Sequence, residues 1–321
     1  MDNKLKPGSV ILVTGGAGFI GSNLSDRLLN LGFLVICLDN FDPFYYETIK
    51  RDNIKIALKH PGYKLIEGDI RDKAFIDTIF KTQGIDMVIH LAAKAGVRPS
   101  IADPPGYFDT NVMGTINILE AMRSYNVKKM IFASSSSVYG NNPQVPFSEN
   151  NNVDYPVSPY AATKKAAELL CHTYYHLFKF DIFCLRFFTV YGPRQRPDLA
   201  IHKFTDLILN NQPIEIYGDG NSSRDYTYID DIVDGIIRST KKLKGYEIIN
   251  LGGGKPVSLI TMIITLEKML NKTAKKIHLP FQQGDVNTTN ADTTKARKLL
   301  EYSPATDFDF GIREFIKWKL K

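Results

Sequence analysis

The first half of the chain alternates short apolar runs with longer segments in which apolar residues recur every three or four positions. The apolar runs are residues 9–14, 34–38, 64–67, 87–91 and 129–135. Short runs of this kind are typical of strands buried on both faces of a parallel sheet, and the segments between them are typical of amphipathic helices. This alternation predicts a doubly wound α/β sheet with right-handed crossovers, a Rossmann fold.

The second half has a less regular pattern. Long helices are expected at residues 114–125 and 160–178, a shorter helix near 203–209, and further buried strands at 181–188 and 248–251. We therefore expect residues 1–186 to form the Rossmann domain, with segments near 226–254 returning to it. Residues 187–321 are expected to form a smaller C-terminal domain that binds substrate.

Composition and length narrow the class of protein. Of 321 residues, 44% are hydrophobic and 23% charged, which is ordinary for a soluble globular chain and suggests about two units of ~150 residues. The N-terminus lacks the apolar stretch of a secretory signal, and the apolar stretch at 256–266 is shorter than the ~20 residues of a membrane helix. A cytoplasmic protein without membrane contact is expected.

Cysteines and charge add little chemistry of their own. Cys37, Cys171 and Cys184 lie singly in apolar stretches, which predicts buried, reduced thiols and neither a disulfide framework nor a metal site. The formal net charge of +6 has no clustered basic stripe or RNA-binding aromatic motif behind it, so no nucleic-acid partner is expected. The excess is assigned to solvated lysine-rich segments such as 241–244 and 272–276.

A glycine-rich turn follows the first predicted strand. Gly15, Gly18 and Gly21 are spaced three apart between a buried strand and a helix, where small residues let a pyrophosphate approach the helix N-terminus. Asp39 ends the second strand, 18 residues past Gly21, where a carboxylate can accept the ribose hydroxyls of an adenosine. Such a carboxylate would repel a 2′-phosphate, and no arginine follows it directly, so NAD is favoured over NADP.

Two hydroxyl-bearing segments suggest acid–base chemistry. Tyr160 and Lys164 lie at i and i+4 on one helix face, where the ammonium can favour the phenolate of a tyrosine that is otherwise too weak a base near neutral pH. Four serines, residues 134–137, end a buried strand where ligands bind in parallel sheets. Capping a turn is the alternative role for one or two of these serines.

Together these segments resemble the extended short-chain dehydrogenase/reductases, specifically the NAD-dependent nucleotide-sugar epimerases, over essentially the whole chain. The matching motifs are TGGAGFIGSNL, LDN, EGDI, HLAAKAGVR, SSSSVYG, Tyr160 with Lys164, and RDYTYIDD. The resemblance implies a catalytic triad of Ser135, Tyr160 and Lys164. The NAD groove that it implies comprises Gly15, Gly18, Phe19, Ile20, Gly21, Asp39, Asn40, Asp69, Ile70, Leu91, Ala92, Ala93, Asn111, Tyr160 and Lys164.

The residues after Ser135 distinguish reactions within that superfamily. Dehydratases that resemble this chain carry an Asp-Glu pair before the Val-Tyr-Gly, and decarboxylases of UDP-glucuronate usually carry a Glu there. This chain has Ser136 and Ser137 instead. An elimination without a positioned acid and base would lose about 10²–10⁴-fold in rate. The expected reaction is therefore inversion at carbon 4 through a 4-keto intermediate.

The sugar is inferred from the run FFTVYGPRQRPD, which resembles UDP-glucuronate 4-epimerases and has Thr189 where most UDP-glucose 4-epimerases have Asn. Arg196 and Ser136 are the candidate anchors for a sugar carboxylate, since a guanidinium fork suits that group. A loop ion pair with Asp198 is the alternative role for Arg196. The resemblance further implies Arg224 and Asp285 as partners of the diphosphate and the uridine ribose.

Three alternatives stay open at this point. UDP-glucose or UDP-N-acetylglucosamine could be the substrate, because the small Thr289 leaves room for an N-acetyl group. A catalytically silent NAD-binding scaffold is a more distant reading, against which the intact Ser135, Tyr160 and Lys164 argue. The helices at 114–125 and 160–178 resemble those that pair across the family's dimer, so a homodimer is expected.

Overall fold

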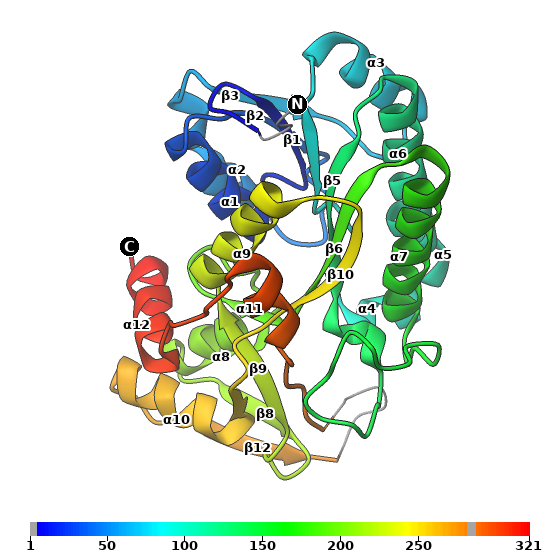
Figure 1. Cartoon of the computed structure of the whole chain (residues 1–321). Helices are drawn as coiled ribbons and strands as arrows, with labels where there is room; N and C mark the ends of the chain where they lie inside the picture. The colour runs from blue at the N-terminus through cyan, green and yellow to red at the C-terminus, as the bar shows by residue number, and fades with distance from the viewer. Residues whose placement is uncertain (1–4, 281–286) are drawn as a thin grey trace.

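The computed structural model describes residues 5–280 and 287–321. Within them, seven strands form one parallel sheet in the order β10–β6–β5–β4–β1–β2–β3 (Figure 1). The strands are β1 (Val10–Thr14), β2 (Leu34–Asp39), β3 (Tyr63–Glu67), β4 (Met87–His90), β5 (Lys129–Ser135), β6 (Asp181–Phe187) and β10 (Tyr246–Leu251). The doubly wound α/β sheet is thus confirmed, and the strands expected at 181–188 and 248–251 both join it.

Helices cover both faces of this sheet because each buried strand sends alternate side chains to opposite sides. Ile11 and Val13 of β1 enter one apolar cluster with residues of α1 and α9, whereas Leu12 enters a second cluster with residues of α3, α6 and α7. The helices on the two faces are α1 (Phe19–Asn30), α2 (Glu47–Ile54), α9 (Ile229–Lys242), α3 (Lys73–Gln83), α6 (Gly114–Ser124) and α7 (Pro159–Phe178).

Short helical segments connect these elements; one precedes β3, and the others follow the carboxyl ends of β4 and β5. They are η1 (Ala57–Lys59), α4 (Val97–Ala102), α5 (Pro104–Phe108), the π-helical η2 (Asp109–Met113) and η3 (Ser136–Tyr139). All three cysteines are buried and free. Cys171 and Cys184 lie in the cluster with α7, which is the apolar role expected for them.

The second half adds two small sheets beside the large one. One has the order β11–β9–β7, and the other pairs β12 with β8. The elements are β7 (Thr189–Tyr191), α8 (Ala200–Leu209), β8 (Pro213–Tyr217), β9 (Ser223–Tyr228), β11 (Pro256–Ser258), α10 (Leu259–Leu270), β12 (Lys275–Leu279), α11 (Thr294–Leu300) and α12 (Phe308–Lys319). The apolar stretch 256–266 thus forms β11 and the start of α10. Across the described residues, no helix is long and apolar enough to cross a membrane.

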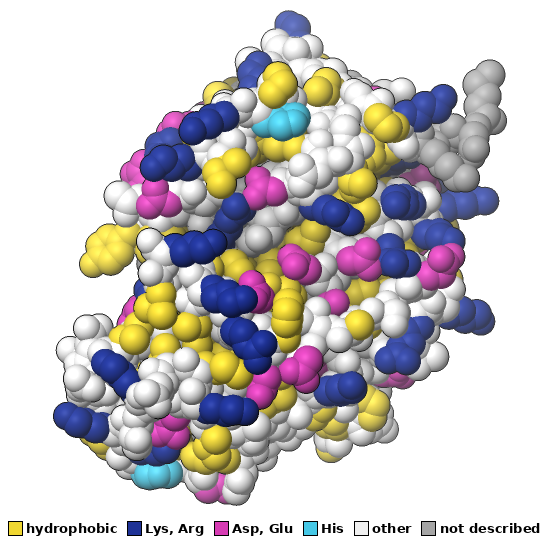
Figure 2. All heavy atoms as spheres, turned by 90° about the vertical axis from the view of Figure 1, so that its left-hand side faces the viewer, with side chains coloured by type: hydrophobic (Ala, Val, Ile, Leu, Met, Phe, Trp, Pro, Cys, Tyr) yellow, Lys and Arg dark blue, Asp and Glu magenta, His cyan; other side chains and the backbone are white. Residues whose placement is uncertain are grey.

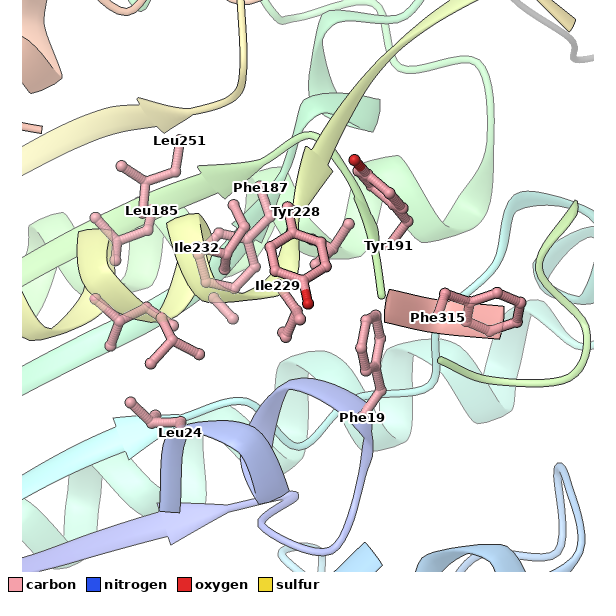
Figure 3. Packing of buried hydrophobic residues seen from close by; sticks show 14 of the residues in the cluster. Phe19, Leu24, Leu185, Phe187, Tyr191, Tyr228, Ile229, Ile232, Leu251 and Phe315 are labelled. Atoms are coloured by element: carbon pink, nitrogen blue, oxygen red, sulfur yellow. The ribbon is translucent and has the colours of Figure 1, made fainter. Parts of the chain in front are cut away.

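One continuous apolar cluster joins the two halves (Figure 3). Leu24 of α1, Leu185 of β6 and Ile232 of α9 belong to the same cluster as Tyr191 and Phe315, which come from β7 and α12. The small sheets and their helices therefore rest on the core of the large sheet. This shared core fixes the residues of the second half against the carboxyl edge of the parallel strands.

Candidate active site

A cavity of about 500 Å³ opens at the carboxyl edge of the parallel strands. The register explains its place, because neighbouring strands end together: Thr14 pairs with His90, and Ser135 with Phe187. Most residues predicted from the sequence line it, namely Gly15, Gly18, Phe19, Ile20, Gly21, Asp39, Asn40, Asp69, Ile70, Leu91, Ala92, Ala93, Ser135, Ser136, Tyr160, Lys164, Thr189 and Arg196.

The glycine turn is tight in the way that its spacing predicts. Gly15 has a φ of +68°, and a Cβ atom there would lie 2.8 Å from the backbone nitrogen of Ala92. A Cβ atom on Gly21 would lie 2.3 Å from the carbonyl oxygen of Gly15. Any side chain at either position would push the loop away from α1 or from the neighbouring strand. The turn therefore brings bare backbone to the cavity directly before the N-terminus of α1.

Asp39 faces the cavity from the end of β2. Its carboxylate accepts hydrogen bonds from the backbone nitrogens of Ala17 (3.1 Å) and Phe41 (2.9 Å) and lies 4.0 Å from the ammonium of Lys50. Burial raises the pKa of Asp39, and the charge of Lys50 opposes this shift. A carboxylate can accept about four hydrogen bonds, so two backbone donors leave capacity for the hydroxyls of a ribose.

The neighbouring acceptor is Asp69, which follows β3. Asn40 donates to it at 2.9 Å, and Arg71 donates both from its backbone and from its guanidinium. Burial acts to raise the pKa of Asp69, but these hydrogen bonds outweigh it and lower that pKa to about 2. This end of the cavity therefore combines fixed carboxylates with the apolar side chain of Ile70, which suits a nucleoside.

Tyr160 stands at the second position of α7, whose start is well defined. Ser158 caps the helix by accepting from the backbone nitrogen of Ala161 at 3.1 Å, and Pro159 occupies the first turn. Burial raises the pKa of the Tyr160 phenol, whereas a hydrogen bond with Ser135 and the charge of Arg196 act in the opposite direction. The phenol therefore faces both groups across the cavity.

Lys164 lies one turn further along the same helix face. Its ammonium donates to the carbonyl oxygen of Ala133 at 2.7 Å, and the residue is 4% exposed. Burial lowers the pKa of Lys164 to about 8. Two of its three N–H donors are left for the cavity that the side chain lines.

The serine cluster both caps a turn and lines the cavity. The Ser135 hydroxyl accepts from the backbone nitrogen of Ser137 at 3.1 Å and donates to the Ser137 hydroxyl at 3.0 Å. Ser134 instead donates to the buried Glu168 at 2.6 Å. Among the described cavity-lining residues the carboxylates are Asp39, Asp42 and Asp69, which follow β2 and β3; β1 and β4 separate these strands from β5, which carries the serines.

Arg196 combines the two roles predicted for it. Its guanidinium forms a bidentate ion pair with Asp198 at 2.9 and 2.7 Å, and it also lines the cavity, 5.4 Å from the ring centre of Phe44. The loop ion pair does not remove the side chain from the site. It holds the planar fork in place where its charge acts on the Tyr160 phenol.

Two predicted residues lie outside the cavity lining, and a third is not among the described residues. Asn111 is buried behind the cavity wall, where its amide binds the backbone of Lys94 and the hydroxyl of Thr163. Arg224 lies on β9 outside the cavity lining and donates to the carbonyl oxygens of Ser223 and Asn287. Asp285 lies outside the described residues.

Sequence reasoning missed the segment after Asp39. Phe44, Tyr45 and Lys50 line the cavity, and Lys50 is buried beside Asp39 while its ammonium also donates to the carbonyl oxygen of Asp42 at 2.9 Å. The aromatic run FDPFYY directly after the carboxylate was the available signal. A lysine on a short helix carries no such signal, because most lysines are solvated.

Comparison with known proteins gives a consistent family and a consistent set of neighbours. A family model described as GDP-mannose 4,6 dehydratase matches residues 12–315. The chain is 48% identical over 309 residues to a UDP-glucuronate 4-epimerase of Thermodesulfobacterium geofontis, covering 96% of this chain and 95% of that protein.

Two solved structures illustrate the range of similar folds. A UDP-glucuronic acid 4-epimerase from Bacillus cereus, in complex with UDP-glucuronic acid and NAD, superposes with a TM-score of 0.91 at 40% identity, covering 97% of this chain and 100% of that one. A UDP-glucose 4-epimerase from Thermotoga maritima, with UDP-glucose, superposes with a TM-score of 0.89 at 30% identity, covering 97% and 98%.

Proposed function

The chain belongs to the GDP-mannose 4,6 dehydratase family of extended short-chain dehydrogenase/reductases, and from this premise we propose that it is an NAD-dependent UDP-sugar 4-epimerase. Its proposed reaction is the interconversion of UDP-glucuronate and UDP-galacturonate. The observation that carries the proposal is the composition of the sugar end of the cavity. Ser135 and Arg196 act on Tyr160 there, and the carboxylates of the described lining follow β2 and β3, which β1 and β4 separate from the serine-bearing β5.

NAD fits the residues of the other end. The bare glycine turn at the start of α1 suits the pyrophosphate, Asp39 suits the adenosine ribose, and Asp69 with Ile70 suits the adenine. When bound, NAD supplies a group that accepts the hydride from carbon 4 of the sugar and returns it. Lys164 is placed to donate its remaining N–H groups to the cofactor's ribose.

Tyr160 is the proposed general base. It removes the proton of the 4-hydroxyl as carbon 4 is oxidised, and it returns a proton to the oxygen when the ketone is reduced from the opposite face. Ser135, whose single hydroxyl proton is donated to Ser137 in this structure, is proposed to turn it toward the same oxygen or the phenolate when substrate binds. The positive charge of Arg196 favours the phenolate, as its effect on the Tyr160 pKa indicates.

Epimerisation is favoured over elimination because the residues after Ser135, in the described part of the cavity lining, offer no acid–base pair for the sugar. Loss of water across carbons 5 and 6 requires a group to remove the carbon 5 proton and another to protonate the leaving hydroxyl. Ser136 and Ser137 stand where related dehydratases carry acidic residues, and a serine hydroxyl is a poor substitute for either role near neutral pH. Return of the hydride is the step that remains.

A uronate substrate makes the role of Arg196 specific. Oxidation at carbon 4 gives a β-keto acid, which loses carbon dioxide unless its carboxylate is held out of alignment with the ketone. We assign this holding role to Arg196, assisted by Ser136 and Thr189, because the guanidinium is fixed by Asp198 and reaches the cavity. The uridine diphosphate extends into the second half of the chain, with Arg224 and Asp285 as its proposed partners.

The binding roles proposed for the two halves of the chain follow the predicted domains. Residues 1–186, with segments near 226–254, are proposed to bind NAD, and residues 187–321 to bind the UDP-sugar. A homodimer formed through α6 and α7 and a cytoplasmic location are part of the same proposal.

Incubation with each candidate substrate tests the function. The purified protein, without added reductant, is given UDP-glucuronate, UDP-glucose or UDP-N-acetylglucosamine, and inversion at carbon 4 is followed by NMR. We expect UDP-glucuronate to have the highest kcat/KM and Tyr160→Phe to lower its turnover by about 10²–10⁴-fold. Retained NAD content in that variant shows that the cofactor site is intact. A preference for UDP-glucose would overturn the substrate assignment, and bound NAD without any turnover would indicate a scaffold.

A further inference from the structure

A buried histidine lies next to the Arg196 segment. His202, the third residue of α8, is 2% exposed. Its Nδ1 lies 2.6 Å from the carbonyl oxygen of Gln195, and its Nε2 lies 2.8 Å from the ammonium of Lys319, at the C-terminal end of α12. The imidazole therefore bridges the loop before α8 and the last helix of the chain.

The chemistry of the two neighbours selects one form of the ring. A carbonyl oxygen only accepts hydrogen bonds, so Nδ1 must carry the proton, and an ammonium only donates, so Nε2 must be bare. Burial lowers the pKa of His202, and the nearby Lys319 charge adds to this effect. The hydrogen bond with Gln195 and the charges of Asp206 and Asp198 act on this pKa in the opposite direction. Asp206 lies 3.5 Å from Nε2, and the aromatic rings of Phe315 and Trp318 also pack against the imidazole.

The accepting carbonyl belongs to the peptide unit that joins Gln195 to Arg196. The hydrogen bond from His202 therefore fixes the plane of the peptide from which Arg196 starts. On the other side of Gln195, Arg194 has a φ of +69° and pairs with Asp26 of α1 at 2.7 Å. The segment is thus held from two sides, and His202 is the anchor next to the guanidinium that reaches the cavity.

We propose that His202, kept in one tautomer by Lys319, is a positioning residue that fixes Arg196 and thereby keeps the uronate carboxylate from being lost during epimerisation. This inference rests on the proposed function. Without the anchor, the peptide before Arg196 can rotate and the guanidinium no longer holds the carboxylate out of alignment with the 4-ketone.

The side reaction has a defined balance. After carbon 4 is oxidised by the bound cofactor, the bond between carbon 5 and the carboxyl carbon breaks and carbon dioxide leaves. The electron pair stays on carbon 5 as an enolate of the 4-ketone, and a proton from water completes the UDP-4-ketopentose. The cofactor then stays reduced unless it returns the hydride to this ketone, which gives a UDP-pentose. The fraction of pentose products therefore reports how well the carboxylate is held.

Two substitutions separate the two nitrogens of the ring. In His202→Asn, the amide nitrogen takes the place of Nδ1 and can still donate to the Gln195 carbonyl. In His202→Gln, the amide reaches the place of Nε2 and can still accept from Lys319, but nothing donates to Gln195. We expect H202Q to raise the pentose fraction from UDP-glucuronate by about fivefold to tenfold, the effect of roughly one lost hydrogen bond. We expect H202N to stay within about twofold of the wild type.

Lys319→Met, a change at the partly exposed end of α12, provides a variant in which the imidazole itself is unchanged. This variant removes the donor that keeps Nε2 unprotonated. The pentose fraction should therefore rise as in H202Q, but by a smaller factor. Proton-coupled ¹⁵N NMR of the wild type should show the His202 proton on Nδ1, a result that does not depend on turnover. Thermal unfolding and NAD content of each variant show whether the fold and the cofactor site survive.

The outcomes are distinguishable. A pentose fraction in H202Q equal to that of the wild type, an equal rise in H202N and H202Q, or a proton on Nε2 overturns the positioning role while leaving the proposed function intact. If the wild-type protein fails to epimerise UDP-glucuronate, the proposed function fails, and the inference fails with it.

Discussion

At the scale of single residues, the site holds charged side chains in buried positions, where burial destabilises the charged form. Lys164 is held between α7 and β5 with a carbonyl as its partner, and burial lowers its pKa from 10.5 to about 8. A folded-state pKa below the unfolded value means that the charged form of this lysine lowers the free energy of unfolding, which is a cost to the folded state. That cost is present in full below pH 8 and disappears as the pH rises to 10.5.

The first prediction follows from this sign. Below pH 8, Lys164→Met removes a penalty of about 3 kcal/mol, since one pKa unit corresponds to about 1.4 kcal/mol. The difference in unfolding free energy between the variant and the wild type should therefore shrink by about 3 kcal/mol between pH 8 and 10.5. Urea unfolding of both proteins across that range measures it. A difference that stays constant with pH would contradict the prediction.

A buried ion pair lies directly behind the serines. Glu168, one turn after Lys164, accepts two hydrogen bonds at 2.8 Å from Arg186 of β6, and a third from Ser134; both charged side chains are 1% exposed. The pair joins α7, which carries Tyr160, to β6, and the Ser134 hydrogen bond joins the same carboxylate to β5. Its removal on one side leaves an uncompensated charge in the core.

Our second prediction concerns this pair. Glu168→Gln should lower the free energy of unfolding by about 3–5 kcal/mol, because Arg186 stays buried without a counter-charge. The exposed pair of Glu67 with Arg51 is the matched control, and Glu67→Gln should change stability by less than about 1 kcal/mol. Denaturant unfolding of the two variants compares them. Equal changes in the free energy of unfolding would mean that burial does not determine how much an ion pair contributes to stability.

Residue by residue, the sequence predicted the parts of the site whose chemistry is tied to spacing. Gly15, Gly21 and Asp39 line the cavity because a strand, a tight turn and a helix leave no other place for them. Lys50 gave no signal, since only the folded chain brings that ammonium next to Asp39. Asn111 holds the Lys94 backbone through its amide, and its contact with NAD stays a prediction.

At the scale of elements, the turn between β1 and α1 requires glycines at positions where a Cβ atom does not fit. The third prediction is that Gly21→Ala abolishes NAD retention and destabilises the fold by about 1–3 kcal/mol, because its Cβ would lie 2.3 Å from the Gly15 carbonyl oxygen. Gly84→Ala is the control: Gly84 has a φ of +61° but no atom within 4 Å of the added Cβ. It should destabilise through backbone strain while NAD content stays normal. Bound NAD, measured after purification, distinguishes the two.

The elements themselves were predictable where local pattern decides them. The helices expected at 114–125 and 160–178 are confirmed within one residue at each end, because their apolar faces and the Ser158 cap are local features. Helix α1 begins at Phe19, directly after the glycine turn, with Gly18 before it and no side-chain cap. The pairing of β12 with β8 could not be predicted, because β12 is almost wholly exposed and has no buried stripe.

At the scale of the whole molecule, the positive net charge is spread over the surface. Figure 2 shows a face on which Lys and Arg side chains are interleaved with Asp and Glu. Several lysines and arginines of the described residues pair with acidic neighbours, as Lys73 does with Asp77 and Lys317 with Glu314. The +6 therefore comes from a small excess in a mixed surface, whereas the cations of the cavity are few and individually placed.

The proposed dimer also concerns the whole molecule, because it depends on which surface is left apolar. Helices α6 and α7 lie along one side of the molecule together with α5 (Figure 1), and α5, η2 and α7 each expose large apolar side chains. Leu169 and Leu177 of α7 are 56% and 59% exposed, and Phe108 and Met113 are 43% and 50% exposed in the neighbouring α5 and η2. Burying leucines of this kind stabilises an interface by about 1.5–3 kcal/mol for each side chain. A second copy of the same surface would supply that burial, since a two-fold dimer matches a patch to itself.

The fourth prediction is that replacing both Leu169 and Leu177 by Glu gives a monomer in light scattering, while the wild type is a dimer. Because α7 also positions Tyr160 and Lys164, loss of the partner should lower kcat as well, with the NAD content retained. Ile264→Glu on α10, at 54% exposure, places a charge on an equally exposed apolar side chain away from α7 and should leave the dimer intact. If the double variant stays dimeric, the dimer forms through another face, and the exposed leucines of α7 have no part in it.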